Sequence, residues 1–470
     1  MLTYSLEKNN GISLYEQLYR YIRGDILSGA LHAGEKLPSK RALSEHLKIS
    51  VITVKNAYDQ LVAEGYIYGV EKRGYFVMDI EKPLSAPEKF PVPREQDAAQ
   101  ETPWFMDFVT NTTATEFFPF ATWAKLMRRT ILERDTGLLL PTPSTGAREL
   151  RQAIAEYLRE FRGMNVSPEQ IIVGAGTEVL YNMLVQLLGR DKRYAVEDPG
   201  YRKIGNIYQS NGVILRRIGL DESGLSITKL RKSDADVVHI SPNHHYPTGI
   251  VMPIARRREL LRWAQEGEKR YILEDDYDSE FRFVGRQIPP LFSADEGQRV
   301  IYLNTFSKTI APSIRISYMI LPPVLMAEYR EKLGFSDCTV SGFDQYILAE
   351  FLHRGHYEQH LSRMRKRYHQ KRDAVVAAIR TGALAQRATI MEDQAGLHFL
   401  VRLDTELPDE ELRRSAAAQG LRLAFLSDYY AVPGEAPAHV LMVNYSGLSL
   451  NDLPEALGRL AGILEEYDHA

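Results

Sequence analysis

The chain has 470 residues, which is longer than one ordinary domain and leaves ample length for a large buried core. Hydrophobic residues make up 44% and charged residues 25%, and the net charge of −3 excludes a uniformly basic nucleic-acid coat. A small DNA-binding module stays compatible with that charge, because local charge placement decides binding. The single cysteine, the N-terminus without a signal-peptide pattern and the lack of a long apolar run predict a cytoplasmic protein.

Residues 1–80 follow the order helix, helix, turn, helix and hairpin. Apolar side chains recur every four positions from Leu14 to Ile26 and predict the first helix. The second helix is expected to begin at Ser39, a preferred N-cap, and the third is VITVKNAYDQLVAEG. Two strands are expected in YIYGVEKRGYFV. This order is that of a winged helix-turn-helix, whose recognition helix enters the major groove of DNA.

The run from SLYEQLYRYIRGDILSGALHAGEKLPSKRALSEHL through VKNAYDQLVAEGYI to KRGYFV closely resembles the DNA-binding domain of GntR-type bacterial regulators. The resemblance implies phosphate contacts at the second helix, groove contacts from the third, and a wing tip near the minor groove. The residues for these three roles are, in order, Ser39 and Arg41; Ser50, Thr53 and Lys55; Arg73 and Gly74. The family often has arginine where this chain has Val51, and a valine suits a thymine methyl. The alternative interpretation is a small helical docking module.

Beyond this module the composition changes twice. Residues 81–104 are rich in Pro, Glu, Gln and Ala, which predicts a linker. From residue 105, short β-branched runs such as IIVGAG, VVHISP, YILEDDY and VIYLNTF alternate with amphipathic helices. This alternation predicts an α/β domain with a mostly parallel sheet, which we place at residues 105–344. A smaller α+β domain is expected at residues 345–470.

The motif NTFSKTIAPSIRISY suits an aldehyde cofactor that carries a phosphate. A lysine, Lys308, can form a Schiff base with the aldehyde. The hydroxyls of Thr305 and Ser307 and the guanidinium of Arg315 can hold the phosphate dianion. Taken alone, each of these residues has an ordinary structural explanation, so the prediction depends on the segments that precede them.

Those segments supply the other parts of a pyridoxal phosphate (PLP) site. Backbone N–H groups at a helix start bind phosphate well, and VGAGTEVLY places Ala175, Gly176 and Thr177 at such a start. Tyr201 in EDPGYRK is expected to stack on the pyridine ring, and ISPNHHYPTG supplies a Pro-Thr-Gly turn beside it.

A carboxylate and a phenol follow at the end of another expected strand, in YILEDDYDSEF. We expect Asp275 to pair with the pyridine nitrogen, which keeps that nitrogen protonated and the ring an electron sink. Tyr277 is expected to hydrogen-bond the phenolic oxygen of the ring.

In this order of motifs, residues 105–470 resemble the fold-type-I aminotransferases. With its GntR-like head, the chain is similar to the MocR-type regulators. The resemblance implies a PLP-dependent transcription factor, usually a homodimer, that binds double-stranded operator DNA. Its large domain would sense an amine or amino-acid-like effector, or PLP itself, through an internal aldimine at Lys308.

Two departures from the family favour a sensor with at most weak transaminase activity. Active relatives grip the substrate carboxylate with an arginine that aligns with Met442 here, and a thioether cannot make that contact. A tyrosine that reaches the phosphate of the neighbouring subunit is replaced by Pro141. The candidates for an alternative carboxylate grip are Arg202, Lys203, His244 and His245.

Two other interpretations stay open. One is an active PLP-dependent aminotransferase with an accessory DNA-binding head. The other is a DNA-binding repressor with a relict domain that binds no PLP. We assign no metal ligands from the sequence.

Overall fold

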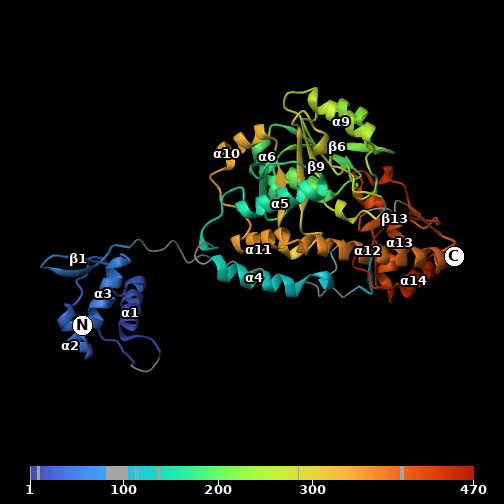
Figure 1. The fold of residues 1–470 in the computed structure, drawn as a ribbon. Helices are drawn as coiled ribbons and strands as arrows, with labels where there is room; N and C mark the ends of the chain where they lie inside the picture. The colour runs from blue at the N-terminus through green and yellow to red at the C-terminus, as the bar shows by residue number, and fades with distance from the viewer. Residues whose placement is uncertain are drawn as a thin grey trace. The chain divides into compact units, whose positions relative to one another are not determined.

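The computed structural model describes residues 2–7, 11–80, 104–111, 113, 115–134, 138–283, 285–391 and 396–469. The chain divides into two compact units, Met1–Glu101 and Thr102–Ala470 (Figure 1). Among the described residues, no helix combines the length and the apolar character needed to cross a lipid bilayer.

The first unit is a three-helix module with a hairpin. Its elements are α1 (Leu14–Ser28), α2 (Lys40–Leu47), α3 (Val51–Ala63), β1 (Ile67–Val70) and β2 (Gly74–Val77). Leu18 and Ile22 of α1 and Val54 and Leu61 of α3 are fully buried, so the two helices form the core of the unit. Because α2 and α3 are joined by a short turn and the hairpin follows, the predicted winged helix-turn-helix is confirmed.

The second unit is built on an eight-stranded sheet. The strands are β4 (Ile171–Gly174), β5 (Arg193–Asp198), β6 (Ile214–Asp221), β7 (Gly224–Leu225), β8 (Val237–Ile240), β9 (Tyr271–Asp275), β10 (Val300–Thr305) and β11 (Ser317–Ile320), in the order β4-β11-β10-β9-β8-β5-β6-β7. The pairs from β10 to β6 are parallel, whereas β11 is antiparallel to both of its neighbours and β7 is antiparallel to β6. The predicted mostly parallel sheet is therefore confirmed.

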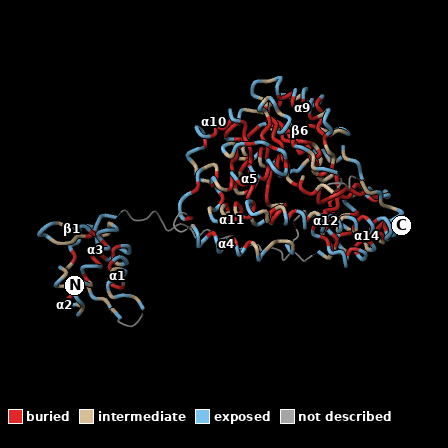
Figure 2. The backbone as a smooth tube through the Cα atoms, in the orientation of Figure 1, coloured by how far each residue is buried: buried red, intermediate tan, exposed pale blue. Residues whose placement is uncertain are grey.

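Helices cover both faces of this sheet, because its strands are apolar on both sides. In β4, Ile171 and Val173 face one core cluster and Ile172 faces another, as strand alternation requires. One face carries α6 (Thr177–Leu188), α7 (Arg202–Ser210) and α10 (Pro323–Leu333). The other carries α4 (Phe120–Arg134), α5 (Arg148–Arg162), α8 (Ile227–Lys232), α9 (Ile254–Gln265) and α11 (Gly342–His353). Figure 2 shows buried residues along these strands.

A smaller subdomain completes the second unit. It contains α12 (His356–Thr381), β12 (Ala388–Met391), β13 (His398–Leu403), α13 (Asp409–Ala418), β15 (Val440–Asn444) and α14 (Leu453–Asp468). The strands form an antiparallel sheet in the order β12-β13-β15. The long helix α12 runs from the large subdomain toward α13 and α14 (Figure 1).

The expected division of residues 105–470 into a large part up to 344 and a small part from 345 needs correction. The strand β3 (Met106–Asp107) pairs with β14 (Leu421–Arg422), and Met106 is buried in the core of the small subdomain. Helix α11 packs against α4 and α5 in the large subdomain, so the passage to the small subdomain falls within α12. The sequence pattern missed both points because a two-residue strand and a continuous helix carry no boundary signal.

Candidate cofactor site and nucleic-acid interface

A cavity of about 450 Å³ lies where the parallel strands of the large sheet end. In open α/β sheets this edge is the usual place for a ligand. The cavity brings together most of the predicted cofactor residues, although they come from five separate segments. Those in its lining are Thr177, Tyr201, Asp275, Tyr277, Thr305, Ser307, Lys308 and Arg315.

Lys308 stands just beyond the end of β10, on the wall of the cavity. Its Nζ donates a hydrogen bond to the carbonyl oxygen of Asn111. Its own carbonyl oxygen accepts a hydrogen bond from Thr113 Oγ1 at 2.8 Å, which holds the segment in place. Burial lowers the pKa of Lys308 to about 8, although the charge of Asp278 opposes the shift. Lys308 therefore loses its proton more readily than an ordinary lysine, which favours the neutral, nucleophilic amine.

Asp275, the last residue of β9, is buried with one carboxylate oxygen left unsatisfied. Tyr181 donates a hydrogen bond from its hydroxyl to Asp275 Oδ2 at 2.6 Å, and His239 Nε2 lies 3.5 Å from the same oxygen. Asp275 Oδ1 has no hydrogen-bond partner among the described residues. A buried carboxylate oxygen without a donor is costly, and a protonated pyridine nitrogen would satisfy it.

Two tyrosines were predicted to flank the cofactor ring. Tyr277 is enclosed in the cavity wall, and burial raises its pKa well above the usual value, so the hydroxyl stays protonated. Tyr201 is half exposed and precedes α7 at the cavity mouth. Its ring meets Tyr246 edge to face, with centroids 5.6 Å apart, which holds it at the mouth where a ring can stack.

The phosphate end of the site is formed by the start of α6 and by Arg315. Gly176 has φ 90°, and a Cβ there would lie 2.2 Å from Arg315 Nη2, so glycine is required. The guanidinium therefore reaches the N-terminus of α6, where the helix dipole favours an anion. Ser307 Oγ is buried without a hydrogen-bond partner among the described residues and can donate to a phosphate oxygen.

Three predicted phosphate contacts are already engaged elsewhere. The backbone N–H of Ala175 donates to Thr339 Oγ1 at 2.9 Å, and Ala175 is absent from the cavity lining. The backbone N–H of Gly176 donates to the Gly174 carbonyl at 2.8 Å, so its role is close approach and not donation. The hydroxyl of Thr305 accepts hydrogen bonds from Ser307 N and Ser317 Oγ. Thr177, the first residue of α6, keeps its place in the lining.

The four predicted effector residues separate into two groups. Lys203 lines the cavity and pairs with Glu178, whereas Arg202 donates to the Tyr430 carbonyl outside it. His244 and His245 are buried, at 3% and 2% exposure, and line no part of this cavity. The structure therefore does not bring these two candidate carboxylate grips into the cavity.

Several lining residues escaped the sequence analysis. Arg217 of β6 lines the cavity, and no hydrogen bond or ion pair holds it among the described residues. Its neighbour Arg216 pairs with Asp234 at 2.8 Å on the opposite side of the strand. Strand alternation in ILRRIGLD was the signal that could have separated the two arginines. Tyr181 and His239 lack any local motif.

Met442, which was expected to stand where active relatives have the carboxylate-binding arginine, does not line the cavity. Met442 of β15 is fully buried in a cluster with Leu400 and Val440, outside the cavity lining. Among the described lining residues, the small subdomain supplies Tyr429 and no arginine. Pro141 is exposed. Met442 therefore lies away from the cavity position at which an effector carboxylate would be gripped.

In the first unit, two of the predicted DNA contacts are helix caps. Ser39 Oγ accepts from the backbone N–H of Ala42 at 3.2 Å, and Ser50 Oγ accepts from that of Thr53 at 3.0 Å. The hydroxyls of Ser50 and Thr53 lie 2.7 Å apart. These contacts fix the starts of α2 and α3. The positive ends of both helices thus stay available for phosphate groups.

The charged DNA-contact candidates are exposed. Arg41 lies on α2, Lys55 on α3 and Arg73 at the turn between β1 and β2. Gly74 has φ 111°, and a Cβ there would lie 3.3 Å from Lys36, so the turn favours glycine. At the start of α3, Val51 and Ile52 are 44% and 70% exposed, and Ile52 is an apolar candidate that the sequence analysis missed.

The chain matches two protein-family models: aminotransferases of class I and II over residues 105–460, and bacterial regulatory proteins of the gntR family over residues 14–77. It is 37% identical over 463 residues to the uncharacterized HTH-type transcriptional regulator YdeL of Bacillus subtilis (strain 168), with 98% of each chain covered. It is 32% identical to the probable rhizopine catabolism regulatory protein MocR of Rhizobium meliloti, covering 97% of this chain and 94% of the relative.

Solved structures agree on the fold of the second unit. The multiple substrate aminotransferase from Thermococcus profundus superposes with a TM-score of 0.69 at 23% identity, covering 79% of this chain and 93% of the enzyme. A kynurenine aminotransferase from Pyrococcus horikoshii gives a TM-score of 0.68 at 22% identity, covering 78% and 92%.

The two family matches, the relatives that align over nearly the whole chain and the cavity have one explanation. PLP is the cofactor of the aminotransferase-type domain, and the residues present fit it: an unsatisfied Asp275 oxygen, an unpartnered Ser307 hydroxyl and an arginine at a helix start. The chain therefore belongs to the MocR-type regulators of the GntR family, which join a winged helix-turn-helix to a fold-type-I aminotransferase domain.

Proposed function

We propose that this protein is a transcription factor whose second unit binds PLP and an amine or amino-acid-like effector, and whose first unit binds double-stranded operator DNA. The observation that carries the proposal is one cavity in which Lys308, Asp275 and Arg315 converge, on a chain that also has a winged helix. An amine-reactive site on a DNA-binding chain suits a sensor of amines.

In this account Lys308 holds the cofactor as an internal aldimine. Its Nζ would supply the amine that links the chain to the cofactor aldehyde, with one water released and no change in oxidation state. PLP supplies the electrophilic carbon and a ring that accepts electrons. Asp275 holds the proton on the ring nitrogen, while Ser307, Arg315 and the start of α6 bind the phosphate.

An amine effector would then exchange with Lys308. The effector nitrogen would take over the bond to the aldehyde carbon, and the two hydrogens that it gives up would pass to Lys308 Nζ, which leaves as a free amine. No atom or electron is gained or lost. A ligand shifts a conformational equilibrium only by its differential affinity for the two states. We propose that this exchange favours a different arrangement of the small subdomain, which changes how the winged helices meet DNA. A second version, in which PLP itself is the signal, needs no amine.

The cations of the cavity indicate what else the effector carries. Lys203 shares Glu178 with Arg315, whose Nη2 lies 3.9 Å from that carboxylate, and Lys308 is committed to the cofactor. Arg217 is the lining cation with no acidic partner among the described residues. We propose that Arg217 and Lys203 bind an acidic group of the effector, in place of the small-subdomain arginine of active aminotransferases.

Exposed apolar side chains on the second unit support the proposed homodimer. Phe120, Ile131 and Leu132 of α4 are 71%, 49% and 68% exposed, and Leu139 and Leu140 are 74% and 69% exposed. Apolar side chains that gather on an exposed face are typical of an interface between subunits.

The second candidate is an active aminotransferase, which the intact set of Lys308, Asp275 and Tyr277 favours. Absorbance of the full-length holoprotein separates the two. A sensor gives a shifted, stable band on addition of an effector amine and releases no keto acid. Steady conversion to the pyridoxamine form with equivalent keto acid would establish the enzyme. The Arg217→Gln variant should weaken the response to acidic amines, whereas Arg216→Gln, which changes the outward-facing neighbour, should leave it unchanged.

A further inference from the structure

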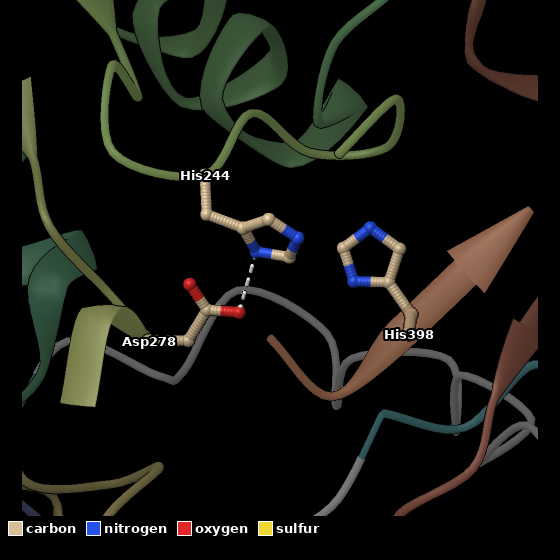
Figure 3. Close-up of side chains that lie close together, drawn as sticks. All are labelled: His244, Asp278 and His398. Carbon is tan, nitrogen blue, oxygen red and sulfur yellow. Dashed lines mark hydrogen bonds and ion pairs between the residues drawn. The ribbon is translucent and has the colours of Figure 1, made fainter. Parts of the chain in front are cut away.

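Three buried side chains meet beside the cofactor cavity but take no part in its lining. His244 follows β8, Asp278 follows β9 and His398 opens β13 (Figure 3). Their exposures are 3%, 2% and 1%, and one ligand atom from each lies within 4.8 Å of the others. The first two belong to the large subdomain and the third to the small one, so the cluster bridges the two.

Hydrogen bonds on the far side of each imidazole fix where the lone pairs point. His398 Nε2 lies 3.1 Å from the Pro247 carbonyl oxygen, which accepts and so places the proton on Nε2. His244 Nδ1 lies 2.9 Å from Asp278 Oδ2, which places the proton on Nδ1 in the same way. The remaining nitrogens, His398 Nδ1 and His244 Nε2, are buried without a hydrogen-bond partner among the described residues.

Figure 3 shows these two unpartnered nitrogens on the sides of the rings that face each other. The ring centroids are 4.8 Å apart. Two buried acceptors that face each other with no donor between them are unfavourable, and a cation between them removes that cost.

We propose that His244, Asp278 and His398 form a binding site for a divalent transition-metal ion of the Zn²⁺ class. Two imidazole nitrogens and one carboxylate are the donors that Zn²⁺ and its neighbours prefer, whereas Mg²⁺ and Ca²⁺ require mostly oxygen ligands. The Pro247 carbonyl on the outer nitrogen of His398 is the usual arrangement around such metals.

The ion would join the two subdomains. Metal–ligand bonds of about 2.0–2.2 Å place the donor atoms of a tetrahedral site roughly 3.3 Å apart. In this cluster the donor atoms are separated by up to 4.8 Å. Binding therefore draws β13 toward the loops after β8 and β9. Gly396, two residues before His398, leaves room for this, since a Cβ there would lie 1.9 Å from His244 Cε1. Asp278 Oδ2 now accepts a hydrogen bond from His244 Nδ1. To bind the ion, the carboxylate would have to turn away from that N–H.

The test uses full-length protein stripped of metal by a chelator and freed of PLP, so that the cofactor does not absorb. Zn²⁺ or Co²⁺ is added, excess ion is removed by desalting, and retained metal is measured by mass spectrometry. We expect one ion per chain and visible absorption typical of four-coordinate Co²⁺. The variant His398→Gln keeps an N–H donor for the Pro247 carbonyl but lacks the free nitrogen, and His244→Ala removes another ligand. Each should lower metal affinity at least tenfold.

The matched control is His353→Ala, which removes a histidine whose side chain is 70% exposed and lies outside the cluster. It should retain the ion as the unchanged protein does. Circular dichroism of each variant shows whether it is folded, and the His398→Gln variant tests the site if His244→Ala is not. The proposal is overturned if the unchanged chain retains no ion, or if His398→Gln retains as much as the control. Because PLP is absent from the measurement, neither result depends on the proposed sensing function.

Discussion

Asp275 is the residue on which the chemistry of the cofactor site depends most. It is held from behind by the Tyr181 hydroxyl at 2.6 Å and approached by His239 at 3.5 Å, which leaves Oδ1 directed to other partners. Tyr208 in turn holds His239, with 2.7 Å between its hydroxyl and His239 Nδ1. A network of this kind fixes the orientation of the carboxylate, and each bond to a charged group contributes about 1.5–3 kcal/mol.

The variant Tyr181→Phe should therefore bind PLP about tenfold more weakly, since 1.4 kcal/mol corresponds to a factor of ten. The ring that remains keeps the packing, so the loss reflects the hydroxyl. Tyr194→Phe serves as the control, because the Tyr194 hydroxyl donates to the Gly189 carbonyl and lies outside the cavity lining. Fluorescence or absorbance titration of the cofactor-free protein with PLP measures both. Equal affinities for the two variants would show that Tyr181 has no role in holding Asp275.

At this scale, residues in local motifs could be predicted and isolated ones could not. Lys308, Asp275 and Tyr277 each follow a strand in a short recognisable run, and the cavity brings them together. Tyr181 lies on the apolar face of a helix, where the sequence gives no sign of a functional role. Its role depends on a hydrogen bond to Asp275, which is 94 positions away in the chain. The cluster of His244, Asp278 and His398 was not predicted for the same reason, since these residues meet only through tertiary packing.

In the winged helix, local helix capping positions the residues that are predicted to contact DNA. Ser39 and Ser50 were predicted as DNA contacts, and both cap helices in the structure. A capping serine contributes typically about 1 kcal/mol to stability, so its replacement would change folding and binding together. Arg41 is exposed, so its replacement is expected to change DNA binding without changing folding.

Arg41→Ala should weaken binding to all DNA sequences alike and lower the slope of log affinity against log salt by about 1. The reason is the loss of one phosphate contact with its released counterion. Arg20→Ala is the control, because Arg20 on α1 is also exposed but pairs with Glu16 at 2.6 Å. Fluorescence anisotropy with operator and unrelated duplexes at several salt concentrations measures the slope. A slope unchanged in Arg41→Ala would contradict the phosphate contact.

The sequence predicted most helices and strands, but it did not predict the two places where the chain passes between the large and the small subdomain. Periodicity predicted the helices of the first unit and the strands around the cofactor, because each has its own apolar pattern. The two-residue strand β3 and the continuous helix α12 depend on partners far along the chain. Such junctions become visible only when the packing is known.

At the scale of the whole molecule, one chain joins a DNA-binding unit to an amine-reactive one. Relatives that align over nearly the full length are named as transcriptional regulators, so the pairing is a property of the family. Around the cofactor cavity, this chain has Arg217 in the lining and a cluster of His244, Asp278 and His398 between the subdomains. Sensing is proposed to depend on the covalent bond at Lys308.

That bond is tested most directly by reduction and peptide mapping. The full-length holoprotein is treated with borohydride, digested and analysed by mass spectrometry. The account predicts a reduced pyridoxyl group on the peptide that carries Lys308, and the same result for Lys203→Ala, which changes a neighbouring lysine of the cavity. A holoprotein without an adduct on Lys308, or with the adduct on another lysine, would contradict the account.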